Sequence, residues 1–309
     1  MNLQQELNKA GGFKNLDLLA KQVVEGFIAG MHKSPFHGFS AEFAEHKIYN
    51  QGESTKHIDW KLYAKTDRLY TKRYDEETNL RCHLIVDRSA SMHYPEAAGF
   101  TIDKLNKIAF SALACASLMH ILKKQRDAVG LSIYSDTYDF YAPEKGSERH
   151  HYMLLDKLSE TVVSKSESQT TETYKYLHQI AEKIHRRSLI FLFTDMFQTS
   201  EDDEKLFEAL RHLKHNKHEV VLFHVYDKEK ELTFQFDNRP KRFIDVETGD
   251  FINLYPDNIK ENYEKAVKSY FENLKLKCGQ YRIKYVEADI NQGFNQILTT
   301  YMIERQKFV

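Results

Sequence analysis

Cysteine, proline and long apolar runs are scarce in this sequence. Its 309 residues include three cysteines and five prolines. The cysteines, Cys82, Cys115 and Cys278, are odd in number, far apart and outside any CxxC pair, so neither a disulfide framework nor a zinc site is indicated. No window offers about 18 consecutive apolar residues, and the first residues lack a basic segment followed by an apolar core. We therefore expect a cytoplasmic protein without a transmembrane helix.

Net charge is also almost absent. The formal charge is −1, so the overall field does not draw the chain toward nucleic acid or an anionic membrane. Residues 56–73 are locally basic, but aspartates and glutamates interleave with the lysines and arginines. Such mixing predicts a solvated face rather than a nucleic-acid groove. Hydrophobic residues make up 41% and charged residues 29%, which is the composition of a globular protein able to bury a core.

Strands and helices alternate through the central part of the chain. Continuous apolar runs predict buried strands, and apolar residues at helical spacing predict the helices between them. In order these are a strand after Arg81, a helix at 101–124, strands at 128–134 and 137–142, helices at 148–159 and 172–184, a strand at 188–193, a helix at 204–216 and a strand at 219–226. This order predicts an α/β fold with a doubly wound, mostly parallel sheet flanked by helices.

Further elements are expected toward both ends of the chain. Toward the N-terminus we expect a helix at 15–31 and strands at 42–49 and 68–74. A β-hairpin insertion is expected at about 231–255, with alternating strands at 232–236 and 251–255. After it we expect a long helix ended by Gly279, a strand at 281–286 and a helix at 291–305. The single tryptophan, Trp60, is expected to be a buried packing anchor.

The chain is expected to divide near residue 80. No linker rich in proline, glycine or serine separates Tyr74 from Arg81. Residues 1–79 are therefore expected to form an N-terminal helix plus a small β-rich extension packed on the core. Residues 80–309 would form the main domain, with the hairpin insertion inside it.

Three small oxygen-bearing residues follow the first buried strand. Asp87, Ser89 and Ser91 occupy alternate positions of Asp-x-Ser-x-Ser, directly after Leu84-Ile85-Val86. Their side chains can converge on one point, and a carboxylate with two hydroxyls meets part of the oxygen coordination that Mg²⁺ prefers. The same residue types are common in turns and helix caps, and the motif taken alone favours that alternative.

Two later positions add to the metal hypothesis. Asp195 follows the apolar strand at 188–193, and Thr170 or Thr171 precedes the helix at 172–184. The carboxyl ends of parallel strands lie at one edge of a sheet, where such folds place their ligand sites. Convergence of Asp87, Asp195 and a threonine on one metal ion is the economical interpretation.

These motifs resemble the metal ion-dependent adhesion site of a von Willebrand factor A domain. Over nearly its whole length the chain resembles, more narrowly, the bacterial "domain of unknown function 58" family. The segments that carry this resemblance are His32-Lys33-Ser34-Pro35, Glu42-Phe43-Ala44-Glu45-His46, Tyr49-Asn50-Gln51-Gly52-Glu53, Ile58-Asp59-Trp60-Lys61 and Asp87-Arg88-Ser89-Ala90-Ser91-Met92.

The resemblance implies a function as well as a fold. It implies that Ser89 and Ser91 bind Mg²⁺ or Mn²⁺ directly, with Asp87 and Asp195 nearby. Thr171 is the better match in the second loop, although Thr170 stands where the family has glycine, so both threonines stay candidates. The resemblance further implies that a partner protein's carboxylate fills the open coordination position, and that the partner is a MoxR-type AAA+ ATPase or its client.

Enzyme chemistry is less well matched by these residues. If Asp87 were the nucleophile of a Mg²⁺-dependent phosphohydrolase, the chain would resemble haloacid dehalogenase-like hydrolases, but these need a second aspartate two residues later, and Ser89 stands there. A serine hydrolase would need glycines where Arg88 and Ala90 stand. The histidines at 150, 151, 212, 215 and 218 are expected to be surface residues rather than zinc ligands. The sequence therefore predicts a metal-dependent protein-interaction module that is not an enzyme.

Overall fold

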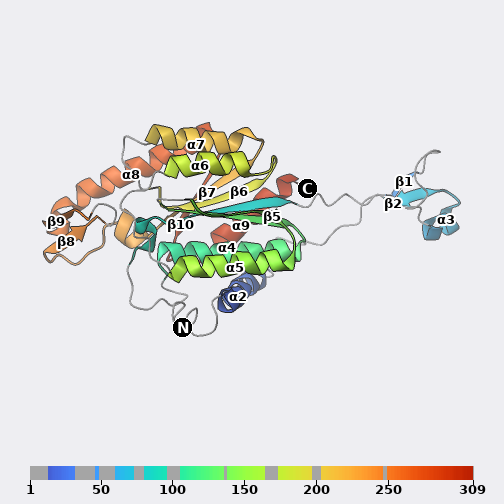
Figure 1. The fold of residues 1–309 in the computed structure, drawn as a ribbon, viewed down its shortest axis with the longest axis horizontal. Helices are drawn as coiled ribbons and strands as arrows, with labels where there is room; N and C mark the ends of the chain where they lie inside the picture. The colour runs from blue at the N-terminus through green and yellow to red at the C-terminus, as the bar shows by residue number, and fades with distance from the viewer. Residues whose placement is uncertain are drawn as a thin grey trace.

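A six-stranded sheet lies between two layers of helices (Figure 1). The computed structural model of this chain describes residues 13–31, 46–48, 60–72, 80–95, 105–135, 138–163, 173–196, 203–245 and 249–308. The sheet strands are β3 (Arg81–Asp87), β4 (Ala128–Tyr134), β5 (Tyr138–Lys145), β6 (Leu189–Thr194), β7 (Glu219–Tyr226) and β10 (Lys284–Asp289). The longer helices are α2 (Phe13–Met31), α4 (Lys107–Lys124), α5 (Glu148–Val163), α6 (Thr173–Lys183), α7 (Asp203–His215), α8 (Pro256–Gln280) and α9 (Asn295–Arg305).

The strand order confirms the predicted doubly wound, mostly parallel sheet. The order across the sheet is β10-β7-β6-β3-β4-β5, and every neighbouring pair is parallel except β4 and β5. From β3 the chain continues to β4 on one side, whereas β6, β7 and β10 extend the sheet on the other side. The connections therefore diverge between β3 and β6, and in open α/β sheets this switch point is where ligands bind.

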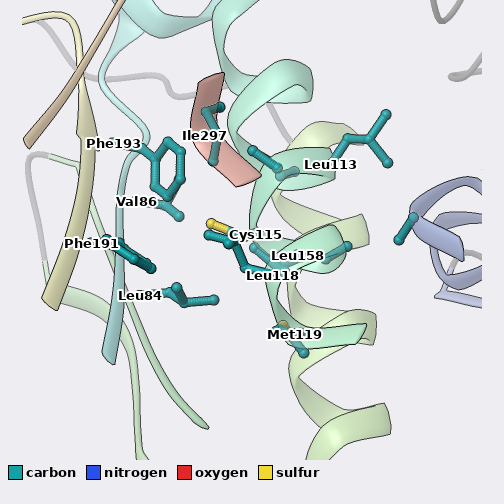
Figure 2. Close-up of a cluster of buried hydrophobic side chains, with 14 of the residues drawn as sticks. Leu84, Val86, Leu113, Cys115, Leu118, Met119, Leu158, Phe191, Phe193 and Ile297 are labelled. Atoms are coloured by element: carbon teal, nitrogen blue, oxygen red, sulfur yellow. The ribbon is translucent and has the colours of Figure 1, made fainter. Parts of the chain in front are cut away.

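Each face of the sheet packs against its own hydrophobic cluster. Alternate side chains of β3 and β6, such as Leu84, Val86 and Phe193, point toward α4, whose apolar surface extends nearly all round (Figure 2). Ile85 points the other way, into a second cluster with α6 and α7. Burial on both faces explains why these strands read as continuous apolar runs rather than alternating ones.

The described N-terminal elements are two helices and a pair of short strands. Helix α2 packs on α4 and α5 through buried Leu16, Leu19 and Val24. The short strands β1 (His46–Ile48) and β2 (Tyr70–Lys72) pair antiparallel, which confirms strand character within the two predicted ranges. Helix α3 (Trp60–Thr66) lies between them in sequence. The prediction for Trp60 was wrong, because its side chain is 63% exposed. The grouping of residues 1–79 into one extension stays a prediction.

The hairpin insertion forms with its second strand where the sequence predicts it, at 251–255, but with a different first strand. Residues 232–236 were expected to be a strand, yet a π-helical turn, η3 (Lys228–Leu232), ends within this range and the pairing strands are β8 (Lys241–Ile244) and β9 (Phe251–Leu254). The cause is local, since the Asp227 carboxylate accepts hydrogen bonds from the backbone N–H groups of Glu229 and Lys230 at 3.0 and 3.3 Å. That capping favours a helical turn over an extended strand.

Several element boundaries also differ from the sequence prediction, among them the start of α4 and the end of α8. Helix α4 was expected from residue 101, but it begins at Lys107, where the side chain of Asn106 accepts a hydrogen bond from Ala109 N at 2.9 Å. Helix α8 was expected to end at Gly279, but it runs to Gln280, and Arg282 takes the left-handed conformation at φ +57°. In the part of the chain that the structure describes, no helix is both long and apolar enough to cross a membrane.

Candidate metal centre

The ends of β3 and β6 bring two of the predicted site segments together. Asp87 is the last residue of β3, Thr194 is the last residue of β6, and the two strands are neighbours. Thr194 Oγ1 donates a hydrogen bond to Asp87 Oδ2 at 2.7 Å. Asp195 follows directly and, like Asp87, is almost completely buried. The predicted meeting of the two loops at one sheet edge is therefore confirmed, and it falls at the switch point.

The loop after Asp87 combines a turn with a pair of facing hydroxyls. Asp87 Oδ1 accepts a hydrogen bond from Ser89 N at 2.9 Å, so this aspartate does serve the local backbone, as the turn alternative requires. Ser89 precedes the 3-10 turn η2 (Ala90–His93), yet its side chain makes no capping hydrogen bond. Instead the hydroxyls of Ser89 and Ser91 share a hydrogen bond, with their Oγ atoms 3.0 Å apart. The hydroxyls are thus held beside each other rather than used as caps.

The spacing and chemistry of these oxygens fit a hard divalent cation. An octahedral Mg²⁺ at about 2.1 Å from its ligands separates neighbouring ligand atoms by about 3 Å. The Ser89–Ser91 oxygen pair, 3.0 Å apart, matches that separation. The remaining donors at the site are carboxylates, which also suit Mg²⁺ and Mn²⁺. Ser89 and Ser91 could hold such an ion directly, with Asp87 and Asp195 close by.

The electrostatics of Asp87 favour a cation. Burial, followed by the nearby charge of Asp195, raises the pKa of Asp87 from 3.8 to about 6, although the hydrogen bonds from Ser89 and Thr194 act in the opposite direction. Two neighbouring buried carboxylates disfavour each other's ionised form. A positive charge placed between them would relieve this repulsion.

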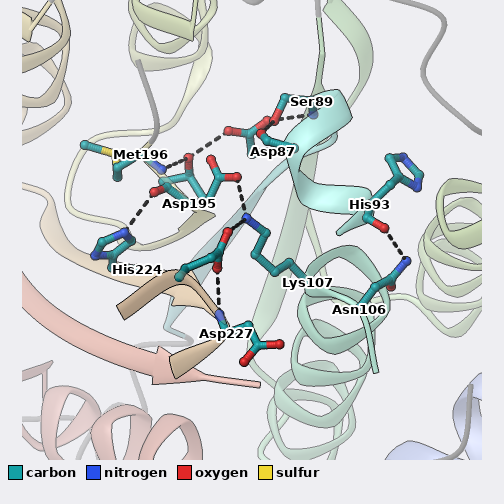
Figure 3. Close-up of polar contacts among 12 residues, drawn as sticks. Asp87, Ser89, His93, Asn106, Lys107, Asp195, Met196, His224 and Asp227 are labelled. Carbon is teal, nitrogen blue, oxygen red and sulfur yellow. Dashed lines mark hydrogen bonds and ion pairs between the residues drawn. The ribbon is translucent and has the colours of Figure 1, made fainter. Parts of the chain in front are cut away.

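A buried lysine is the principal feature that the sequence prediction missed. Lys107, in the first turn of α4, is 1% exposed, and its Nζ lies 2.9 Å from Asp195 Oδ2 and 2.6 Å from Glu231 Oε1 (Figure 3). Burial by itself lowers the pKa of Lys107, but the charges of Asp195 and Glu231 hold it above its ordinary value. The available signal was a lysine at the start of a helix whose next residues are mostly apolar, since buried lysines are nearly always paired.

Backbone contacts hold the loop after β6 in place. His224 Nε2 lies 2.8 Å from the carbonyl oxygen of Asp195, and His224 Nδ1 lies 2.6 Å from the Tyr285 hydroxyl. Burial lowers the pKa of His224 to about 4, so the ring is neutral. A carbonyl can only accept, so Nε2 carries the proton and Nδ1 accepts from the tyrosine. Tyr270 donates a further hydrogen bond to the carbonyl of Met196.

The remaining site predictions have different outcomes. Thr170 and Thr171 lie outside the described residues, so the second loop stays a prediction. Within the described ranges, no group of three or more His, Cys, Asp or Glu residues could hold a metal ion, so the candidate centre depends on hydroxyls as well as carboxylates.

The surface assignment was wrong for His150, His151 and His218, which are all buried. His218 accepts a hydrogen bond from Ser188 N at 3.1 Å, which is a structural role.

Fold and site together define an α/β protein with acidic and hydroxyl side chains at the switch point of a mostly parallel sheet. The chain belongs to the family described as "Protein of unknown function DUF58", which matches residues 45–272. It is 23% identical over 146 residues to the uncharacterized protein Mb1516 of Mycobacterium bovis and to the uncharacterized protein Rv1480 of Mycobacterium tuberculosis. The match covers 47% of this chain and 44% of each relative, so it spans less than half of their length.

Solved structures give more distant similarities. A conserved hypothetical protein BatB from Bacteroides thetaiotaomicron is 15% identical with a TM-score of 0.44, and the match covers 74% of this chain and 100% of that one. An aerotolerance-related membrane protein from Bacteroides fragilis, with multiple mutations to serine, is 13% identical with a TM-score of 0.43, over 73% of this chain and 97% of that one.

Proposed function

We propose that this protein is a metal-dependent protein–protein interaction module and not an enzyme. In this proposal Ser89 and Ser91 hold Mg²⁺ or Mn²⁺, and Asp87, Asp195 and a threonine of the 170–171 loop complete the surroundings of the ion. The bound ion would supply a Lewis-acidic position for a carboxylate of the partner protein. The observation that carries the proposal is the serine hydroxyl pair, 3.0 Å apart, beside a buried carboxylate at the switch point.

The proposed partner is a MoxR-type AAA+ ATPase or its client, for which this protein would act as an adaptor or chaperone-like component. This part of the proposal comes from the family resemblance of the segments between His32 and Met92. The chemistry of the site is compatible with it, because an ion held by two neutral hydroxyls keeps much of its charge for an incoming acid.

The arrangement of Asp87 argues against the alternative of a phosphohydrolase. A nucleophilic carboxylate must present an oxygen to its substrate. Both oxygens of Asp87 already accept hydrogen bonds, from Ser89 N and Thr194 Oγ1, and the residue is 3% exposed. Asp87 is therefore better placed to orient the loop and to balance the charge of an ion than to attack a phosphate.

Two measurements on the same variants test this proposal. The double variant Ser89→Ala/Ser91→Ala removes both proposed direct ligands with little change in volume, and we expect it to lose Mn²⁺ binding in calorimetric titration. Affinity capture with the wild type should retain an AAA+ ATPase in Mg²⁺ and release it in EDTA, and the double variant should retain none. Ser117→Ala is the matched control, since this buried hydroxyl donates only to the Leu113 carbonyl, at 2.8 Å, within α4.

Either of two outcomes would contradict the proposal. If the wild type and the double variant bind Mn²⁺ equally, the serines are not ligands. If the ATPase is retained equally in Mg²⁺ and EDTA, an ion does not bridge the two proteins. Phosphatase turnover that disappears in Asp87→Asn would favour the enzyme alternative.

A further inference from the structure

Among the described side chains in contact at the candidate centre, carboxylates outnumber the single ammonium group. The Lys107 ammonium is shared between two carboxylates, those of Asp195 and Glu231. Asp87 contributes a third carboxylate, which is buried beside Asp195. With all four groups ionised, three negative charges face one positive charge, and a divalent cation would bring the sum to zero. The lysine is therefore part of the electrostatic environment of any ion at this site.

The contacts of Lys107 also limit what Asp195 can offer a metal. One carboxylate oxygen of Asp195, Oδ2, is engaged by the ammonium at 2.9 Å. A metal bound through the other oxygen would lie only a few ångströms from the lysine charge, in a region from which water is largely excluded. Like charges at that separation repel strongly when they are buried. Asp195 is thus a weak partner for an ion as long as Lys107 is present.

Glu231 supplies part of the charge that offsets this lysine. Its Oε1 accepts from Lys107 at 2.6 Å and its Oε2 accepts from Asp227 N at 2.7 Å, so Glu231 is fixed within the turn η3. The Tyr263 hydroxyl of α8 donates to the Glu231 carbonyl at 2.9 Å, which links the turn to the long helix. Glu231 therefore offsets part of the repulsion that the Lys107 charge would exert on an ion at this site.

We propose that Lys107 is an affinity-determining residue of the metal centre, which weakens ion binding so that the ion is held firmly only together with a partner's carboxylate. Lys107 engages Asp195, and Glu231 moderates the effect. A carboxylate from the partner would add a negative charge near the ion. This charge would replace the attraction that Asp195 cannot provide while it is paired with Lys107. This inference rests on the proposed function, and it adds that the ion and the acidic group of the partner bind cooperatively.

The test compares two variants with opposite expected effects on Mn²⁺ affinity, measured by calorimetric titration with the metal alone. Lys107→Met removes the competing charge and frees Asp195, so we expect affinity to rise about tenfold or more, given the size of buried charge interactions. Glu231→Gln keeps the shape but leaves the lysine charge less balanced, so we expect affinity to fall about tenfold. Lys284→Met is the control, because Lys284 pairs with Glu304 at 3.0 Å, within the C-terminal segment.

Folding of each variant is checked by circular dichroism and thermal unfolding. Lys107→Met leaves two buried carboxylates without their cation. If Lys107→Met does not fold for this reason, Glu231→Gln still tests the inference. Unchanged affinity in folded Glu231→Gln, or a lower affinity in folded Lys107→Met, would overturn the inference. If Ser89→Ala abolishes Mn²⁺ binding but Lys107→Met and Glu231→Gln bind like the wild type, only this inference fails. If the wild type shows no binding that depends on Ser89, the proposed function fails as well.

Discussion

Replacing Asp87 by asparagine should stabilise the metal-free protein at neutral pH. The substitution keeps the size of the side chain and an oxygen that can accept from Ser89 N, but it removes a charge that is buried beside Asp195. Removal of a buried, poorly balanced charge usually favours the folded state. Under the proposed function, this destabilising carboxylate would be kept for binding rather than for stability.

The pKa of Asp87 gives the magnitude and the sign of this effect. Burial and Asp195 raise its pKa from 3.8 to about 6. Between these two values the folded state binds the proton and the unfolded state does not, so stability falls as pH rises from about 4 to about 6. Two pKa units correspond to about 3 kcal/mol of unfolding free energy. Asp87→Asn does not lose this stability, so its unfolding free energy at pH 7 should be higher than that of the wild type by up to about 3 kcal/mol.

Urea unfolding in EDTA, measured at pH 4 and at pH 7, tests this expectation. The difference between Asp87→Asn and the wild type should be larger at pH 7, and added Mn²⁺ should stabilise the wild type but not Asp87→Asn. Asp127→Asn is the matched control, because Asp127 is equally buried but pairs with Arg305 at 3.0 Å and should therefore lose stability when neutralised. A lower stability of Asp87→Asn at pH 7, with no difference between the two pH values, would refute the reasoning.

Three further predictions concern the surrounding fold. Gly130→Ala would place a methyl group 2.5 Å from His83 Nδ1, so we expect a loss of about 1–3 kcal/mol in urea unfolding. Asn106→Ala removes the cap of α4 and should cost about 1 kcal/mol, measured in the same way. Burial lowers the pKa of His218 to about 4, and its neutral ring accepts from Ser188 N. The wild type should therefore lose about 2 kcal/mol between pH 7 and pH 5 through this histidine, a loss that His218→Asn should lack.

The parallel strands were predictable because burial on both faces leaves a continuous apolar run. Residues 189–194 and 219–226 show this pattern and form β6 and β7. Asp87 and Asp195 could be placed at one edge because the carboxyl ends of parallel strands coincide. This part of the site follows from local sequence pattern combined with a general rule of topology.

The errors arose where tertiary packing outweighs local pattern. The alternation at 232–236 is typical of a strand, but the rings of Phe234 and Phe236 pack with Phe243, at 5.4 and 5.2 Å between centroids, while Asp227 caps the preceding turn. Lys107 could not be assigned to the site, since its partner Glu231 lies 124 residues further along the chain. Contacts of this kind depend on the complete fold, and the spacing of residues along the sequence does not indicate them.

The same long separations determine when the centre can form during synthesis. Thr194 follows Asp87 by 107 residues, and the Tyr285 hydroxyl that meets His224 is 61 residues further along than that histidine. A growing chain therefore exposes the Asp-x-Ser-x-Ser loop long before the groups that position Asp87 and Asp195 have all left the ribosome. Under the proposed function, only finished molecules would present the complete centre to an ion together with a partner's carboxylate, and this would distinguish them from unfinished chains.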